Sequence, residues 1–173
     1  MNCTPETHDI ISDYEVVRRL DEDSMSSVAL AKALDLDTST SSCSSAEEEL
    51  VVLKYGTKKV IRDVLKHEYH ALKAINHPNI IKPIAFKKSL DGGKKMNVLA
   101  LPYWKHGDLF DLVEVRGGLK ENTGWVIAKQ LISAIKYIHK YNIVHRDIKL
   151  ENILVKDDYS VELIDFGFAE YRE

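Results

Sequence analysis

Residues that could carry out chemistry gather near the end of this chain. Residues 145–152 read H-R-D-I-K-L-E-N, and after a β-prone run residues 165–167 read D-F-G. Asp147 and Asn152 share one predicted loop, whereas Asp165 follows the end of the next predicted strand. Taken singly, each aspartate would be a solvated loop carboxylate, because acids are rarely buried. Together these oxygen-bearing side chains have the chemistry that a hard cation such as Mg²⁺ prefers.

This pattern resembles the catalytic loop and metal-binding loop of eukaryotic-type serine/threonine protein kinases. Seven fixed residues at fixed offsets match by chance at a frequency of about 10⁻⁹ per start position. The resemblance implies that Asp147 orients the substrate hydroxyl and accepts its proton, and that Asn152 and Asp165 hold the Mg²⁺ ions that bridge the phosphates of ATP. Lys149 matches the serine/threonine pattern and would contact the transferred phosphate. The implied function is ATP- and Mg²⁺-dependent phosphorylation of protein serine or threonine.

A lysine and a glutamate upstream fit the same family pattern. Residues 51–54 read V-V-L-K, which resembles the family's V-A-I-K strand, and Glu68 lies nine residues before the sequence H-P-N-I. The resemblance implies an ion pair in which Glu68 directs Lys54 toward the α- and β-phosphates. On its own, a lysine after an apolar run is more often a surface residue whose stem lies along apolar atoms.

The segment L-P-Y-W at 101–104 is similar to the family's gatekeeper and hinge. There the adenine would be held by main-chain groups, so Pro102 is acceptable because its position supplies only a carbonyl. The N–H of Trp104 would be the donor. An interlobe linker whose aromatic side chains simply pack is the alternative for this segment. The resemblance completes the expected cofactor-binding residues with Val28, Val52 and Leu154.

The chain departs from the family at the phosphate-binding loop. The family pattern G-x-G-x-x-G-x-V falls on Asp21, Asp23, Ser26 and Val28, so only the valine matches. Glycine allows the backbone to approach phosphates closely. Each aspartate would add about 2 kcal/mol of repulsion at ~8 Å and an effective dielectric constant of ~20, and together they would weaken ATP binding about a thousandfold.

A second departure lies at the end of the sequence, six residues after Gly167. The family continues into an activation segment and a helical scaffold. We therefore expect an incomplete C-terminal lobe and a partly uncovered apolar face on the helix at 121–141, where a regulatory protein could bind. Two alternatives to an active enzyme stay open: a pseudokinase that serves as an interaction module, and an inactive kinase fragment that binds nucleotide weakly.

The elements that would position these residues define an α+β fold. A five-stranded antiparallel sheet with one helix would form an N-terminal lobe, followed by an incomplete α-helical lobe. Alternating and continuous apolar runs predict strands at 14–20, 28–34, 50–53, 80–86 and 97–101, with a turn at 91–93. Helical spacing predicts helices at 58–75, 108–115 and 121–141. The predicted domains are an extension at 1–12, an N-lobe at 13–102 with a flexible Ser/Thr-rich insertion at 35–49, a hinge at 103–107 and a partial C-lobe at 108–173.

Composition limits the range of partners. The formal net charge of -3 gives no electrostatic signal for nucleic acid or an anionic membrane, so we expect neither as a partner. No run of 18 apolar residues occurs. The two cysteines lie in polar stretches, which argues against a disulfide framework or a zinc site. We expect an intracellular protein, cytoplasmic or nuclear.

Overall fold

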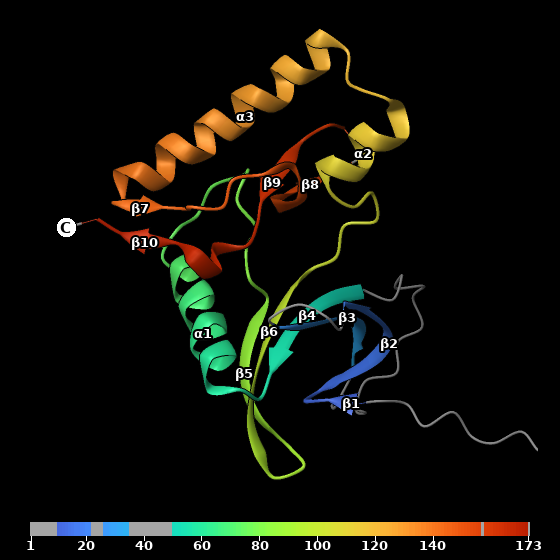
Figure 1. The fold of residues 1–173 in the computed structure, drawn as a ribbon, viewed down its shortest axis with the longest axis vertical. Coiled ribbons are helices and arrows are strands. Elements are labelled where there is room, and N and C mark those ends of the chain that lie inside the picture. The colour runs from blue at the N-terminus through green and yellow to red at the C-terminus, as the bar shows by residue number, and fades with distance from the viewer. Residues whose placement is uncertain (1–9, 22–25, 35–49, 157, 173) are drawn as a thin grey trace, which may run out of the picture.

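The computed structural model describes residues 10–21, 26–34, 50–156 and 158–172 (Figure 1). The predicted insertion at 35–49, residue Asp23 and most of the predicted extension at 1–12 lie outside these residues. Within them the chain forms two regions. The first is a curled antiparallel sheet with a helix beside it, and the second, at the top of the view, is dominated by two helices (Figure 1).

One antiparallel sheet of six strands makes up most of the first region. Its strands lie in the order β1-β2-β3-β4-β6-β5. Their bounds are β1 Ile10–Ile11, β2 Tyr14–Asp21, β3 Ser27–Ala33, β4 Leu50–Gly56, β5 Ala85–Asp91 and β6 Lys94–Pro102. The five longer strands equal the number that we expected. The sixth strand, β1, has only two residues and pairs with the start of β2. The central strands β3, β4 and β6 bury an apolar cluster that includes Ala29, Leu53 and Val98.

The fourth predicted strand, at 80–86, was wrong in position. The strand begins only at Ala85 and runs to Asp91. Ile80 and Ile81 are buried instead in the core shared with the second region, where the Ile81 N–H donates to the Leu163 carbonyl at 3.1 Å. β5 lies at the edge of the sheet and is only partly buried, so it carries lysines and no continuous apolar run. Its sequence therefore gave a weak strand signal.

The turn between β5 and β6 agrees with the prediction. Asp91 pairs with Lys94 across a two-residue connection. Gly92 and Gly93 have φ angles of 52° and 79°, both in the left-handed region. Two consecutive residues with positive φ are what a tight type I′ hairpin requires, which is why glycine occupies both positions.

Helix α1 (Lys59–Lys73) packs against the sheet through a buried face that contains Leu65, Glu68, Ala71 and Leu72. It ends before the sequence H-P-N-I, because proline restrains the residue that precedes it. The Nδ2 group of Asn97, a buried side chain of β6, donates to the Arg62 carbonyl at 2.8 Å and ties the first turns of α1 to the sheet.

The second region contains α2 (Leu109–Arg116), α3 (Glu121–Lys140) and several short strands. Asp108 caps α2 by accepting a hydrogen bond from the Asp111 N–H at 2.9 Å, and Gly117 ends the helix with a φ of 65°. The short elements are β7 Ile143–Val144, β8 Ile153–Val155, β9 Val161–Leu163 and β10 Glu170–Tyr171, with 3₁₀ turns at Leu150–Asn152 and Phe166–Phe168.

The apolar stripe of α3 is less uncovered than we expected. Ile127, Ala134 and Ile138 are buried in the core that joins the two regions. The reason is that α3 packs on β7 and β9, which cover this stripe. Its exposed apolar side chains lie elsewhere on the helix, with Trp125 57% and Val126 50% exposed. In the described part of the chain, no helix is both long enough and apolar enough to cross a membrane.

Candidate active site

Lys54 stands at the centre of the candidate site. It lies in β4, opposite Val28 of β3 and Leu99 of β6, so two flanking strands fix its backbone. Its Nζ is 2.9 Å from Glu68 Oε1 and 3.1 Å from Asp165 Oδ1. The predicted contact between Lys54 and Glu68 is therefore confirmed, and Asp165 joins it from a segment 111 residues farther along the chain.

The charges around Lys54 support one another. Its side chain is 14% exposed and that of Glu68 only 2%. Burial acts to lower the pKa of Lys54, but the charges and hydrogen bonds of Glu68 and Asp165 outweigh burial and hold this pKa above its ordinary value. The ammonium group is therefore charged, and it is held between Glu68 of α1 and Asp165 of the D-F-G segment. A buried pair of this kind needs good geometry to offset its desolvation.

A cavity of about 300 Å³ opens beside this ion pair. Its lining includes Val28, Lys54, Glu68 and Asp165, together with Ser26 from the segment where the family has its last loop glycine. The volume is at the lower end of the range for pockets that hold small ligands. Val52, Pro102, Trp104, Leu154, Asp147, Lys149 and Asn152 are not among the described residues that line this cavity.

The loop at 145–152 gathers Asp147, Lys149 and Asn152 into one hydrogen-bonded group. Asn152 is buried, and its Nδ2 group donates to the Asp147 carbonyl at 2.8 Å and to Asp147 Oδ2 at 2.9 Å. Lys149 Nζ lies 3.2 Å from the same Oδ2 atom. The hydrogen bond from Lys149 is the main cause that lowers the pKa of Asp147, with Asn152 contributing in the same direction. The carboxylate is therefore held in its charged form.

The buried His145 links this loop to the segment before Asp165. It is 1% exposed, and its Nδ1 accepts from the Asp147 N–H at 3.2 Å while its Nε2 lies 2.8 Å from the Ile164 carbonyl. Because a carbonyl only accepts, Nε2 carries the proton. Burial lowers the pKa of His145, which keeps the ring neutral. The ring also meets the buried Phe166 edge to face, with centroids 4.7 Å apart.

The D-F-G segment turns sharply to reach Lys54. Asp165 has a φ of 64°, in the left-handed region, and Phe166 is fully buried behind it. A Cβ atom at Gly167 would lie 3.1 Å from Val64 Cγ1 of α1, so glycine permits the helix and this segment to approach closely. The Phe166 side chain thus anchors the segment while Asp165 faces the cavity.

Trp104 of the predicted hinge is tied to the second region by its side chain. The indole Nε1 donates to Glu162 Oε2 at 3.0 Å, and Lys156 Nζ lies 2.6 Å from Glu162 Oε1. The Lys156 ammonium also lies 4.4 Å from the centre of the indole ring. Our sequence reasoning missed Glu162. The sequence feature that could have indicated it is a single carboxylate between two apolar residues of a short strand, V-E-L.

Comparison with known proteins places this geometry in a family. Residues 38–173 match the protein kinase domain. The chain belongs to the protein kinase family. The resemblance to eukaryotic-type serine/threonine protein kinases is thereby confirmed, as is a fold with a curled antiparallel N-lobe sheet.

Three curated relatives illustrate the range of similarity. The mouse (Mus musculus) serine/threonine-protein kinase SIK1 is 36% identical over 104 residues, which cover 60% of this chain and 13% of the relative. CBL-interacting protein kinase 21 of Oryza sativa subsp. japonica is 29% identical over 156 residues, covering 90% of this chain and 28% of the relative. Putative sperm motility kinase W of Mus musculus is 34% identical over 163 residues, covering 93% and 30%. The chain thus spans less than a third of the length of each of these relatives.

The kinase chain brings its predicted site residues together in two groups. Lys54, Glu68 and Asp165 contact one another at the cavity. Asp147, Lys149 and Asn152 form the second group, joined to the first because the Ile164 N–H, next to Asp165, donates to the Asn152 carbonyl at 3.0 Å. Of the remaining predicted residues, Val28 lines the cavity from β3, Val52 and Pro102 lie in the paired strands β4 and β6, and Leu154 lies in β8. Trp104 follows the end of β6.

Proposed function

We propose that this protein kinase chain transfers the γ-phosphate of ATP to serine or threonine hydroxyl groups of proteins, with Mg²⁺ as its metal. The observation that carries the proposal is the double contact of Lys54 with Glu68 and Asp165. It puts a charged donor for phosphate oxygens next to a carboxylate that can hold a cation. Phosphoryl transfer depends mainly on such positioning and charge neutralisation.

The oxygen groups at the site fit Mg²⁺. The two Nδ2 protons of Asn152 are used in bonds to Asp147, which leaves its Oδ1 as a potential ligand. One oxygen of Asp165 contacts Lys54, and its side chain is 33% exposed and lines the cavity. No cluster of three or more His, Cys, Asp or Glu that could hold a metal occurs among the described residues. A Mg²⁺ ion at such a site would take one or two protein oxygens and complete its shell with nucleotide phosphates and water.

In this proposal Asp147 is the residue that orients the substrate hydroxyl and receives its proton. Its two oxygens have different surroundings: Oδ2 is held by Asn152 and Lys149, and Oδ1 would be the atom that meets the substrate hydroxyl. Lys149 is 46% exposed and can turn from Asp147 to the phosphate as negative charge moves there. A lysine that follows the charge in this way stabilises the transition state more than the ground state.

The hinge would hold the adenine through main-chain groups of Pro102 and Trp104, with Val28, Val52 and Leu154 as apolar neighbours. The support for this role is the tether from Trp104 to Glu162, which fixes the backbone after β6. A fixed donor loses little entropy when ligand binds.

The retained acids favour an enzyme over an interaction module that has lost nucleotide handling. We nevertheless propose that ATP binds weakly, because the phosphate-binding loop has no glycine at the three family positions. Ser26, which lines the cavity, adds a side chain where phosphates would approach. The proposed partners are protein substrates, without nucleic acid or membrane, in the cytoplasm or nucleus.

Two measurements test this function. Calorimetric titration with Mg-ATP should give weak, metal-dependent binding that is lost in Asp165→Ala. Transfer of radiolabelled phosphate to a Ser/Thr peptide library should fall at least about a hundredfold in Asp147→Asn, the lower range for general base catalysis, while its Mg-ATP affinity is unchanged. Equal transfer by the wild type and Asp147→Asn would overturn the proposed role.

A further inference from the structure

Helix α1 and the D-F-G segment lie side by side (Figure 1). Val64 and Glu68 are four residues apart on α1, so they lie on the same face of the helix. Val64 packs against Gly167. The Glu68 carboxylate accepts a hydrogen bond from the Phe166 N–H, besides its contact with Lys54. The helix that carries half of the ion pair therefore rests directly on the D-F-G segment.

A histidine next to Glu68 makes a further contact with this part of the chain. His67 Nε2 lies 2.7 Å from the Ala169 carbonyl oxygen. Because a carbonyl only accepts, Nε2 carries the proton and is the donor of this hydrogen bond. Ala169 is 3% exposed, and its own N–H donates to the Phe166 carbonyl at 3.0 Å. The acceptor of the His67 bond thus belongs to a closed and buried turn.

The loop at 145–152 holds the same turn through Arg146. The Arg146 Nε donates to the Phe168 carbonyl at 2.7 Å, and its Nη1 contacts the Glu170 carboxylate. These two bonds lie immediately before and after Ala169 along the chain. The turn is therefore fixed to the loop at 145–152, and it cannot simply follow α1. A helix that is bonded to the Ala169 carbonyl is placed relative to that loop as well.

Loss of the His67 bond would act on the ion pair through the backbone of α1. His67 and Glu68 are consecutive residues of one helix, so a movement of the helix at His67 also moves the Glu68 carboxylate. The contact of Glu68 with Lys54 is 2.9 Å long, and a hydrogen bond needs a narrow range of distance and angle. A small shift of α1 would therefore release Lys54 from the position in which it also contacts Asp165.

We propose that His67 is a positioning residue for phosphoryl transfer, and that its bond to the Ala169 carbonyl keeps α1 in place. With α1 in this place, Glu68 can pair with Lys54. The inference rests on the proposed function and gives His67 no contact with nucleotide or substrate. His67 is not among the described residues that line the cavity at the ion pair, so its effect reaches the nucleotide through Glu68 and Lys54. Because the donor at Nε2 carries this role, a glutamine, whose side-chain amide has a similar reach, should replace the histidine.

The first measurement is amide hydrogen exchange of the whole chain without nucleotide, read at the Phe166 N–H that bonds to Glu68. His67→Leu removes the donor and keeps a side chain of similar bulk. We expect exchange at this amide to become about fivefold faster in His67→Leu, the typical effect of one hydrogen bond. His67→Gln should keep the wild-type rate. The matched controls are His70→Leu and His70→Gln, because His70 lies on the same helix and is exposed.

The second measurement is the dependence of phosphate transfer on Mg-ATP, with the Ser/Thr peptide library as substrate. We expect His67→Leu to raise KM for Mg-ATP about fivefold, and His67→Gln and both His70 variants to keep the wild-type KM. A histidine that merely stabilised the fold would change other quantities. Its loss would lower the melting temperature and the amount of folded enzyme, which reduces the apparent kcat and leaves the KM of the folded molecules unchanged.

Three results would overturn the inference. They are a His67→Leu variant with wild-type KM and wild-type exchange at Phe166, a His67→Gln variant as impaired as His67→Leu, and a His70→Leu variant with the same effect as His67→Leu. In each case, phosphate transfer by the wild type leaves the proposed function standing. A wild-type chain that neither binds Mg-ATP nor transfers phosphate would overturn the proposed function and with it this role of His67, and the exchange measurement without nucleotide would still show whether His67 holds α1 in place.

Discussion

The ion pair between Lys54 and Glu68 gives the sharpest test of the site. We expect Glu68→Gln and Lys54→Met to act on both stability and nucleotide binding, because Glu68 is buried and Lys54 nearly so. Glutamine keeps the size and hydrogen-bonding capacity of the glutamate and removes only its charge. Methionine keeps the length of the lysine stem and removes the ammonium group from two carboxylates.

The distances set the expected magnitudes. At 2.9 and 3.1 Å, each contact of Lys54 has a gross Coulomb attraction of roughly 5 to 6 kcal/mol at an effective dielectric constant of ~20, much of it offset by desolvation. Breaking a buried pair by removing one partner costs about 3–5 kcal/mol. For Glu68→Gln we expect the low end, about 3 kcal/mol, because Asp165 still neutralises Lys54. For Lys54→Met we expect the high end at neutral pH.

The pH dependence separates the two variants. Burial raises the pKa of Glu68, and removal of Lys54 would raise it further. The folded state of Lys54→Met would then bind a proton at a pH where the unfolded chain does not. Its free energy of unfolding should therefore recover, relative to the wild type, as the pH falls from 7 toward the unfolded-state pKa of about 4.3. Glu68→Gln lacks this group and should show no such recovery.

Urea unfolding at several pH values and calorimetric titration with Mg-ATP provide the measurements. Glu68→Gln should also weaken Mg-ATP binding, since Lys54 loses one of the two groups that aim it. If both variants unfold within about 0.5 kcal/mol of the wild type, the range of ordinary surface substitutions, then the pair does not form in solution and our reasoning about the site is wrong.

Three further predictions concern other parts of the chain. Mg-ATP affinity, measured by calorimetry, should rise by up to roughly a thousandfold when glycine is restored at the three loop positions: Asp21, Asp23 and Ser26. No gain would contradict the argument from charge and bulk. Glu162→Gln should lower the melting temperature and red-shift the Trp104 fluorescence, because it removes the charge that holds the indole and Lys156; an unchanged emission spectrum would argue against the tether. Because burial lowers the pKa of His145, the unfolded chain binds a proton first, so stability is full above the unfolded pKa of about 6.5 and falls below it, by up to about 1.4 kcal/mol per pH unit. Urea unfolding of His145→Gln should show a shallower fall, and an identical pH profile would refute this assignment.

The catalytic pattern could be read from the sequence because its residues are few and closely spaced. Asp147, Lys149 and Asn152 lie on one loop, so their proximity follows from the covalent chain. The contact of Lys54 with Glu68 was predicted as well, through a likeness of each segment to a known pattern. Helices α1 and α3 were placed within two residues of their ends because helical spacing of apolar residues records which face is buried.

Strand β5 shows where local pattern fails. Ile80 and Ile81 had the apolar character of a strand, but they are buried against β9, while the true strand carries lysines at the edge of the sheet. An apolar run indicates only that its side chains are buried. It does not indicate whether a neighbouring strand or another region of the protein covers them.

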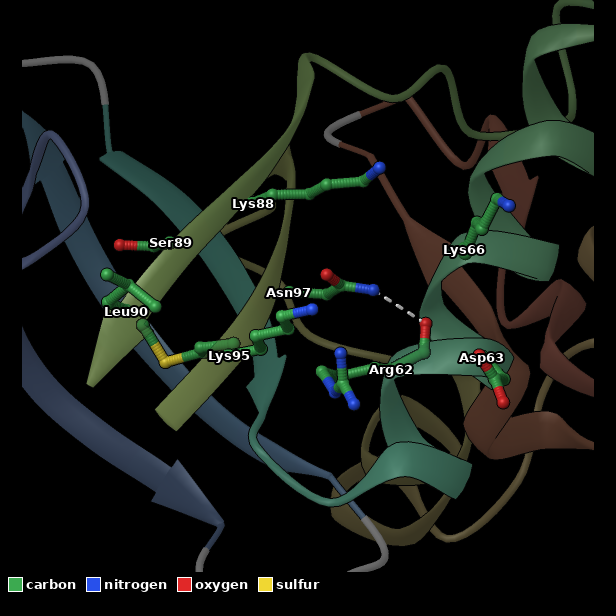
Figure 2. Close-up of a pocket in the computed structure, with 9 residues that line it drawn as sticks. Arg62, Asp63, Lys66, Lys88, Ser89, Leu90, Lys95 and Asn97 are labelled. Carbon is green, nitrogen blue, oxygen red and sulfur yellow. Dashed lines mark hydrogen bonds between the residues drawn. The ribbon is translucent and has the colours of Figure 1, made fainter. Parts of the chain in front are cut away.

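The tether of Trp104 to Glu162 and the cavity between α1 and the β5–β6 hairpin (Figure 2) were decided by the tertiary structure. Glu162 lies 58 residues after Trp104. The lysines that line this cavity come from α1 and from a hairpin more than twenty residues later. Singly, each of these lysines is typical of a solvated surface. The sequence by itself determined the family, the spacing of the loop residues at 145–152 and the faces of the helices, since these depend on neighbours along the chain. Folding determined which charged groups meet, because electrostatic interactions depend on distance in space and that distance is set by the packing of elements remote in sequence.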